Sequence, residues 1–180
     1  MKRTIAIIAV AMLAVSLVAF TKKPANPPSM NGFAEAISRN PIDECYDGGP
    51  GTIYVNDRFT EYWEKEVEHT FGLLCDLLEA GDLEKLKLEQ QLWLEFWNSP
   101  DLAEVLYERN KAELQGEKYE DYVLDSPSIQ RLMEMRRRAY QLMEQYYLLI
   151  GEVCFIFEGP DEDAIVNPSP VGPDRWREAS

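Results

Sequence analysis

From about Tyr54 onward, apolar residues recur along the chain at intervals of three and four. Six of them form one stripe: Phe59, Trp63, Val67, Phe71, Leu74 and Leu78. This spacing places the side chains on one face of a helix, and the other face carries charged residues such as Glu61 and Lys65. The pattern therefore predicts a long amphipathic helix that ends at Gly81, with Asp82 capping the helix that follows.

Three further helices are predicted downstream. The helix at about 83–97 has a wide apolar surface, so it needs more than one neighbour. The next two helices each follow a serine–proline pair, because serine caps a helix and proline suits its first position. One follows Ser99-Pro100 and reaches about Leu114, and the other covers about 127–150.

Residues 152–157 are short, apolar and aromatic, and their periodicity leaves a strand and a helical extension equally open. Together the patterns predict an all-α fold. We expect a small up-and-down bundle of three to four helices with irregular N- and C-terminal segments.

The two ends of the chain differ in composition from this helical region. A short basic start precedes an unbroken run of small and apolar residues, 5–20, and the pair Lys22-Lys23 follows, which is the layout of an export signal. The run is short for a membrane-spanning helix. We therefore expect residues 1–20 to be a cleaved signal, with an uncleaved anchor as the alternative.

The remaining boundaries follow from proline, glycine and charge. Residues 21–44 are predicted to be a linker, in which 32–39 are compatible with a short turn of helix. Residues 45–158 form the predicted helical domain. Residues 159–180 are rich in proline and acidic groups and are predicted to be a disordered tail.

The chain is strongly acidic, with 18 Lys and Arg against 32 Asp and Glu and a formal net charge of −14. Nucleic-acid backbones and anionic membrane surfaces bind clustered Lys and Arg, so both would repel this protein. We expect no nucleic-acid partner, and no membrane contact except through an uncleaved N-terminal segment. Basic proteins are the electrostatically favoured partners, although such a charge also serves solubility alone.

Three segments resemble a known family of secreted bacterial proteins, the LprI N-terminal-like family. Residues 64–71 resemble its Asp-x-Glu-Leu-Asn-x-x-Tyr signature, and residues 90–97 resemble its Gln-x-x-Trp-x-x-Phe/Tyr-Arg helix. Residues 133–138 resemble its final helix. The residues that carry the resemblance are Glu64, Glu66, Phe71, Gln90, Trp93, Phe96 and Arg136. The chain departs from the family at Glu68 and Trp97, where asparagine and arginine are usual, and it lacks two of the family's expected cysteines.

The resemblance implies a small periplasmic helical bundle, and members of the family are named for lysozyme inhibition. A basic lysozyme would suit an acidic protein, because opposite charge accelerates encounter. We therefore expect an exported acidic helical binding protein of the bacterial cell envelope, periplasmic or secreted, with a basic protein such as lysozyme as its partner. An envelope structural or assembly protein without an inhibitory role is the main alternative, and a hydrolase is a more distant one.

The sequence contains no pattern typical of a catalytic or metal site. Glu66 and His69 have the three-residue spacing that di-iron bundles use, but such bundles need that motif twice and this chain has one histidine. We therefore predict no enzyme activity, no catalytic residue, no bound metal and no cofactor.

The predicted partner-binding segment is the acidic loop 116–125, which joins the last two helices. Its candidate residues are Glu117, Tyr119, Glu120, Asp121, Tyr122 and Asp125. Acidic groups can steer a basic protein, and tyrosines bury a large area at little entropic cost. The alternative is a solvated connector whose tyrosines pack back on the bundle.

Three cysteines in an oxidising compartment would leave one pair and one remainder. If four helices alternate up and down, Cys45 and Cys154 lie at the same end of the bundle. Cys75 would lie about 30 Å away, near the far end of the first long helix. We therefore expect a Cys45–Cys154 disulfide, with Cys75 as a small buried apolar residue.

Overall fold

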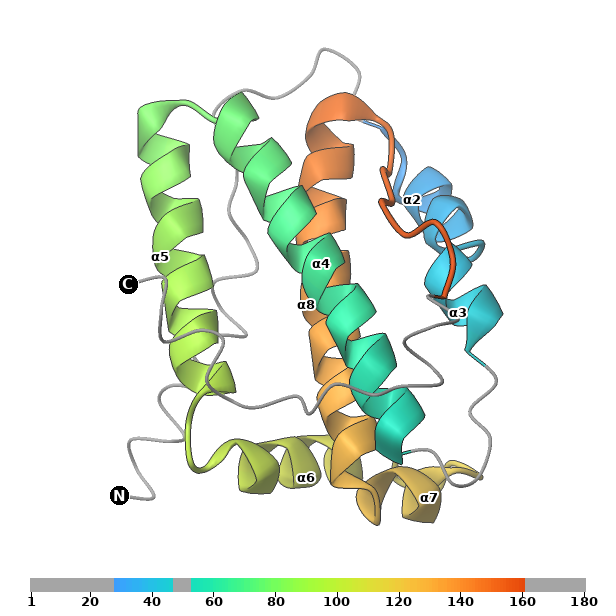
Figure 1. Ribbon diagram of the computed structural model, residues 1–180. Coiled ribbons are helices and arrows are strands. Elements are labelled where there is room, and N and C mark those ends of the chain that lie inside the picture. The colour runs from blue at the N-terminus through green and yellow to red at the C-terminus, as the bar shows by residue number, and fades with distance from the viewer. Residues whose placement is uncertain (1–27, 47–52, 161–180) are drawn as a thin grey trace.

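The computed structural model describes residues 28–46 and 53–160, and these are almost entirely helical (Figure 1). The helices in chain order are α2 (Met30–Ile37), α3 (Pro41–Cys45), α4 (Ile53–Leu77), α5 (Ala80–Trp97), α6 (Leu102–Glu113), α7 (Glu120–Leu124) and α8 (Pro127–Ile150). No strand occurs in these two ranges. The prediction of a small all-α bundle is confirmed. The predicted export signal and most of the predicted tail lie outside the described residues.

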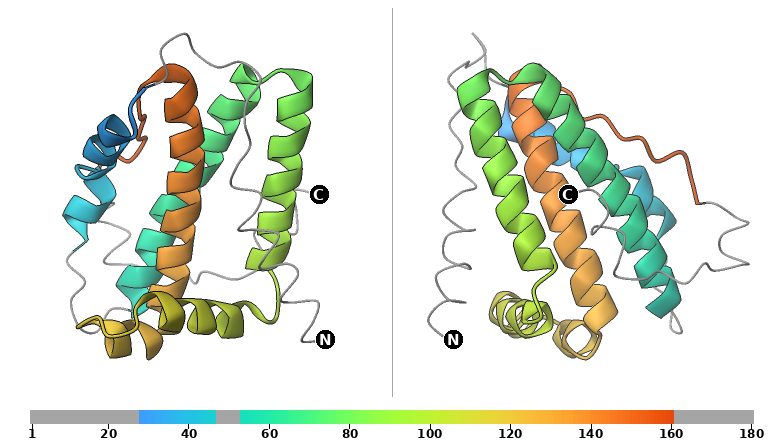
Figure 2. Two further views of the ribbon diagram at one scale, coloured as in Figure 1. Left: turned by 180° about the vertical axis from the view of Figure 1, so that it is seen from behind. Right: turned by 60° about the vertical axis from the view of Figure 1, so that its left-hand side comes forward.

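Helices α4, α5 and α8 form the body of the bundle, and α6 and α7 lie across one end of it (Figures 1 and 2). The most extensive helix pair is α4 with α8. These two helices run in the same direction, because α6 crosses the end of the bundle instead of running its length (Figure 1). The expected strict alternation of direction therefore stops after α5.

The core lies mainly between α4 and α8, as the apolar stripes predict. Trp63 and Val67 of α4 and Leu142 and Met143 of α8 are each at most 1% exposed. The Trp63 ring meets the Tyr140 ring edge to face, with centroids 5.2 Å apart. Burial of side chains of this size contributes about 1.5–3 kcal/mol each, so this pair of helices dominates the stability of the fold.

The helix boundaries agree with the predicted ones at α8 and differ between α4 and α5 and at the start of α6, which begins at Leu102 after Asp101 and not at Pro100. Helix α8 begins at Pro127 and ends at Ile150, where Gly151 adopts a left-handed conformation with φ 88°. Helix α4 instead ends at Leu77, so Gly81 does not terminate it but lies in the first turn of α5. Asp82 is likewise inside α5 and pairs with Lys85 at 2.8 Å, so its predicted capping role is wrong.

The predicted linker 21–44 is wrong over its second half, since α2 and α3 belong to the fold. Phe33 of α2 is buried and packs on Tyr147 of α8, with ring centroids 5.5 Å apart. Ile42 of α3 is fully buried in the same core. Asn40 caps α3 by accepting a hydrogen bond from the Asp43 N–H. The folded domain therefore begins before Cys45.

Residues 152–158, which we call the strap, are neither a strand nor a helical extension. They are an irregular segment that leaves the end of α8 and turns back down the molecule (Figure 1). Val153, Phe155 and Phe157 are half-buried against the core, whereas Cys154 and Ile156 are exposed. Sequence periodicity could not identify this state, because the strap is held by a side chain of another helix.

Candidate docking surface

The predicted acidic loop 116–125 is partly helical. Gly116 has φ 83°, a conformation that favours glycine, and it reverses the chain after α6. The Gly116 N–H donates a 2.8 Å hydrogen bond to Oε2 of Glu120, the first residue of α7. Glu120 therefore closes the turn that begins α7, and it is less available to a partner than the sequence suggested.

A small apolar cluster of its own holds α7 against the bundle. Val123 of α7 is buried with Leu114 and Ile129, and Met133 packs against them. The side-chain amide of Gln130 also donates a 3.0 Å hydrogen bond to the Leu124 carbonyl. Because these contacts use the inner side of α7, its outer side is left for solvent or for a partner.

The two tyrosines and three of the acids are exposed on α7 or directly beside it. Tyr119 is 50% exposed and Tyr122 is 51% exposed, so the tyrosines do not pack back into the bundle. Glu117, Asp121 and Asp125 are exposed. Lys118 is the one cation that the sequence places among these groups. We call Glu117, Tyr119, Asp121, Tyr122 and Asp125 the acidic–aromatic surface.

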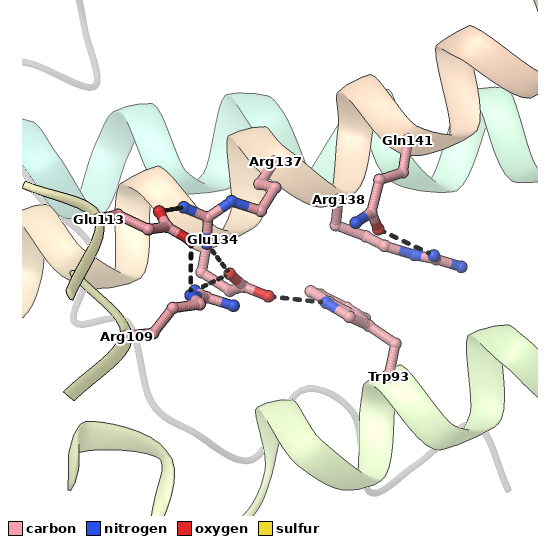
Figure 3. A network of polar contacts seen from close by, with 7 residues as sticks. All are labelled: Trp93, Arg109, Glu113, Glu134, Arg137, Arg138 and Gln141. Atoms are coloured by element: carbon pink, nitrogen blue, oxygen red, sulfur yellow. Dashed lines mark hydrogen bonds and ion pairs between the residues drawn. The ribbon is translucent and has the colours of Figure 1, made fainter. Parts of the chain in front are cut away.

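A second polar cluster lies inside the bundle and was missed in the sequence (Figure 3). Arg138 of α8 is 2% exposed and bonds Glu89 of α5 at 2.5 Å and Gln90 at 2.8 and 3.1 Å. Its guanidinium also lies 5.8 Å from the centre of the Trp93 ring. Burial lowers the pKa of Arg138, and the charge of Glu89 opposes that shift. The cluster therefore joins α5 to α8 through a buried ion pair.

Glu134 of α8 extends this cluster toward α6. Its carboxylate pairs with Arg109 of α6 and, at 3.0 Å, with Arg137, while the Trp93 indole N–H donates to it at 3.4 Å (Figure 3). Arg137 also pairs with Glu113 at 2.8 Å. Most of these groups pair with one another, although the buried Nε of Arg109 has no hydrogen-bond partner, so the cluster holds α5, α6 and α8 together.

A sequence signal for this cluster did exist. Glu134, Arg138, Gln141 and Gln145 recur at intervals of four, three and four along α8. They form a polar stripe beside the apolar stripe of the same helix, and three of them are buried. A polar stripe at helical spacing is ordinarily a solvated face, so only the positions of α5 and α6 distinguish the two cases.

The residues that carry the family resemblance are mostly structural. Gln90 and Trp93 are buried in the cluster just described, Phe96 is buried in the apolar core, and Glu66 is fully buried on α4. Glu64 and Phe71 are half-buried on the same helix.

Arg136 lies elsewhere, where it pairs with Asp43 of α3 and stacks on the Tyr140 ring at 4.9 Å. Burial raises the pKa of Tyr140 to about 12, the positive charge of Arg136 opposes that shift, and the negative charge of Asp43 adds to it. Arg136 therefore fixes α3 to α8.

The expected Cys45–Cys154 disulfide is not formed. Both thiols are free and exposed, and Cys75 is also free and is half-buried, not fully buried. The physical reason is the direction of α8: because α4 and α8 run parallel, the start of α4 and the end of α8 lie at opposite ends of the bundle (Figure 1). Burial raises the pKa of the Cys75 thiol, and the charge of Lys87 opposes that shift.

Within residues 28–46 and 53–160, no group of three or more His, Cys, Asp and Glu side chains could hold a metal ion. The same residues include no helix long and apolar enough to cross a membrane. Comparisons with family models, with curated proteins and with solved structures found no match to this chain.

Proposed function

We propose that this protein is an exported, non-enzymatic binding protein of the bacterial cell envelope that captures a basic protein through its acidic–aromatic surface. The observation that carries the proposal is the pair Tyr119 and Tyr122, half-exposed among exposed carboxylates at the start and in the middle of the firmly held helix α7. Exposed tyrosines with few rotamers are efficient contact residues, and the carboxylates around them steer a cationic partner.

The support of α7 matters to this proposal. A docking group on a mobile loop loses affinity to ordering, whereas Val123 and Gln130 already fix this short helix in the free protein. The acidic charge of the whole chain adds long-range attraction for the same class of partner. Lysozyme is the partner that the family resemblance suggests, and inhibition of lysozyme would follow if this surface covered its substrate cleft.

Export rests on residues 1–20, whose basic start and apolar run are typical of a signal. Expression of the full chain in a bacterium, followed by fractionation and intact-mass measurement, tests this part. We expect the protein in the periplasm or medium with its N-terminal segment removed. Full-length protein in the cytoplasm would contradict the proposal.

Binding is tested by titrating the purified chain with hen lysozyme at low and at high salt, with lysozyme activity measured in parallel. We expect binding that weakens as salt rises, since exposed charges are screened. The double variant Tyr119→Ala/Tyr122→Ala should weaken binding by about tenfold or more, the usual scale for aromatic contact residues. Tyr107→Ala on α6 is a matched control, because Tyr107 is also exposed but lies outside the surface.

Two results would contradict the proposal at different levels. If lysozyme does not bind at low salt, the partner suggested by the resemblance is wrong. If lysozyme binds but the Tyr119/Tyr122 variant and the Tyr107 variant behave alike, a basic protein is captured elsewhere on the molecule.

A further inference from the structure

The strap 152–158 is attached to the bundle in an unusual way. It follows Gly151, and none of its residues makes a backbone–backbone hydrogen bond to another part of the described chain. Three half-buried side chains, Val153, Phe155 and Phe157, pack against the core. The hydrogen bonds that fix its path come from one side chain, Glu66 of α4.

Glu66 is fully buried, yet its carboxylate binds amide groups of the strap and forms no salt bridge with a described residue. Its Oε1 accepts from the Ile156 N–H at 3.0 Å and from the Phe157 N–H at 2.9 Å. A buried carboxylate without a cation is costly and persists only where donors satisfy it. Glu66 is therefore specialised for two consecutive backbone N–H groups.

The aromatic contact lies one helical turn away from this carboxylate. Tyr62 precedes Glu66 by four residues, so both side chains lie on the same face of α4. The Tyr62 ring meets the Phe157 ring with centroids 4.9 Å apart. Tyr62 and Glu66, which we call the seat, thus bind one aromatic side chain and the backbone beside it.

Recognition by the seat depends little on the identity of the exposed strap residues. Cys154, Ile156 and Glu158 face solvent, and Glu66 contacts main-chain atoms only. Peptide recognition of this kind combines main-chain hydrogen bonds with contacts to alternate side chains. The strap displays the chemistry of such a ligand within its own chain.

We propose that the seat is a binding site for an extended peptide of a partner protein, and that the strap is the intramolecular ligand that occupies this site in the free chain. The partner peptide has apolar side chains at alternate positions and two consecutive residues with free N–H groups, so neither of those two is proline. Binding of the partner displaces the strap, which then rotates about Gly151, the residue that joins it to α8. This site lies on α4 and is separate from the acidic–aromatic surface.

The test uses a labelled peptide with the sequence of residues 152–158 and serine in place of Cys154. Fluorescence anisotropy measures its binding to the full chain and to the full chain carrying Phe155→Ser and Phe157→Ser. We expect saturable binding to the variant, about tenfold tighter than to the unaltered chain, because the strap of the unaltered chain competes at high effective concentration. Circular dichroism confirms that the variant is folded.

The hydrogen bonds between Glu66 and the peptide are tested from both sides, by a change in the protein and by a change in the peptide. Glu66→Gln in the variant should weaken peptide binding by about tenfold, the scale of one hydrogen bond to a charged group, and Glu68→Gln on the exposed face should not change it. A peptide N-methylated at Phe157 keeps its side chain but lacks the donor, and should also bind about tenfold more weakly.

Hydrogen exchange on the unaltered chain gives a second readout that needs no variant. Excess unlabelled peptide should remove the protection of the Ile156 and Phe157 amides. Several results would overturn the proposal: no saturable binding to the folded variant, equal binding of the N-methylated peptide, or unchanged protection at saturating peptide. Light scattering that finds a dimer of the unaltered chain but a monomer of the Phe155→Ser/Phe157→Ser variant would also overturn it, since the strap of a second copy would then be the occupant.

Discussion

At the residue scale, the fold depends on charged side chains that are removed from water. Arg138 and Glu89 form a buried ion pair. The attraction between two buried charges is largely offset by the cost of removing both from water, so the intact pair adds little to the free energy of unfolding. Removal of one partner leaves the other charge buried and uncompensated. The Arg138–Glu89 pair is therefore expected to matter more for the arrangement of α5 on α8 than for the free energy of unfolding.

This view makes a prediction for a double-mutant cycle. Arg138→Met alone should lower the free energy of unfolding by about 3–5 kcal/mol, whereas Arg138→Met with Glu89→Leu should recover most of that loss. Urea unfolding of the two variants and of Glu89→Leu measures the cycle. A loss below about 1 kcal/mol for Arg138→Met would mean that water reaches Glu89.

The buried carboxyl of Glu66 should make the stability of the fold depend on pH. Burial raises its pKa above the ordinary value, while the Ile156 and Phe157 amides oppose that shift. The native state then holds the Glu66 proton more tightly than the unfolded state does. The contribution of this group to stability is complete below the unfolded pKa of about 4.5 and is lost as the pH rises through the higher native pKa.

Glu66→Gln removes this titration. The stability of the unaltered chain, measured relative to that of the Gln variant by urea unfolding, should therefore fall as the pH rises from about 4.5 toward neutrality. Glu68→Gln is the control, because Glu68 is exposed on the same helix. A difference that stays constant over this pH range would show that the Glu66 pKa is the same in the folded and unfolded states.

At the element scale, two glycines should respond in opposite ways to the same substitution. Gly72 lies inside α4 with nothing within 4 Å of an added Cβ, so Gly72→Ala should raise stability by about 0.5–1 kcal/mol. Gly151 has equal space but a φ of +88°, so Gly151→Ala should lower stability by about 1 kcal/mol or more. Thermal unfolding measures both, and a gain at Gly151 would contradict its left-handed conformation.

The elements also separate what the sequence could predict from what it could not. Helix α8 was predicted from Pro127 to Ile150 because a serine–proline pair and a glycine mark its ends, and these signals are local. The crossing angle of α6 has no local signal. It decides the direction of α8, and the Cys45–Cys154 prediction was wrong for that reason.

At the candidate surface, too, composition could be predicted from the sequence, whereas the helix and its contacts could not. The sequence predicted that residues 116–125 are acidic and contain two tyrosines, but the short helix α7 within them depends on Val123 reaching Leu114 and Ile129. The role of Glu120 depends on the left-handed turn at Gly116, four residues earlier, whose N–H donates a hydrogen bond to the Glu120 carboxylate. Burial of Glu134 and Arg138 depends on neighbours in α5 and α6, so periodicity along α8 alone could not predict it.

At the scale of the whole molecule, the proposed docking surface and the N-terminal end of the fold lie far apart. Residues 28–37 enter the fold beside the C-terminal part of α8, where Phe33 packs on Tyr147. Helices α6 and α7 lie at the opposite end of the bundle (Figures 1 and 2). The acidic–aromatic surface and the first described residues of the fold therefore lie at opposite ends of the bundle.

The central claim is that the acidic–aromatic surface, and not net charge alone, captures a basic partner. Two triple variants lose the same three charges: Glu117→Gln/Asp121→Asn/Asp125→Asn on the surface and Glu68→Gln/Asp76→Asn/Glu84→Gln away from it, all at exposed positions. Glu120 is left in place because it closes the turn before α7.

The deciding measurement is the association rate constant of each variant with lysozyme by stopped-flow fluorescence, over a range of salt concentrations. We expect the surface variant to associate about tenfold more slowly at low salt and with a flatter salt dependence, and the remote variant to stay within about twofold of the unaltered chain. Equal slowing of both variants would mean that only net charge attracts the partner, and it would contradict the assignment of this surface.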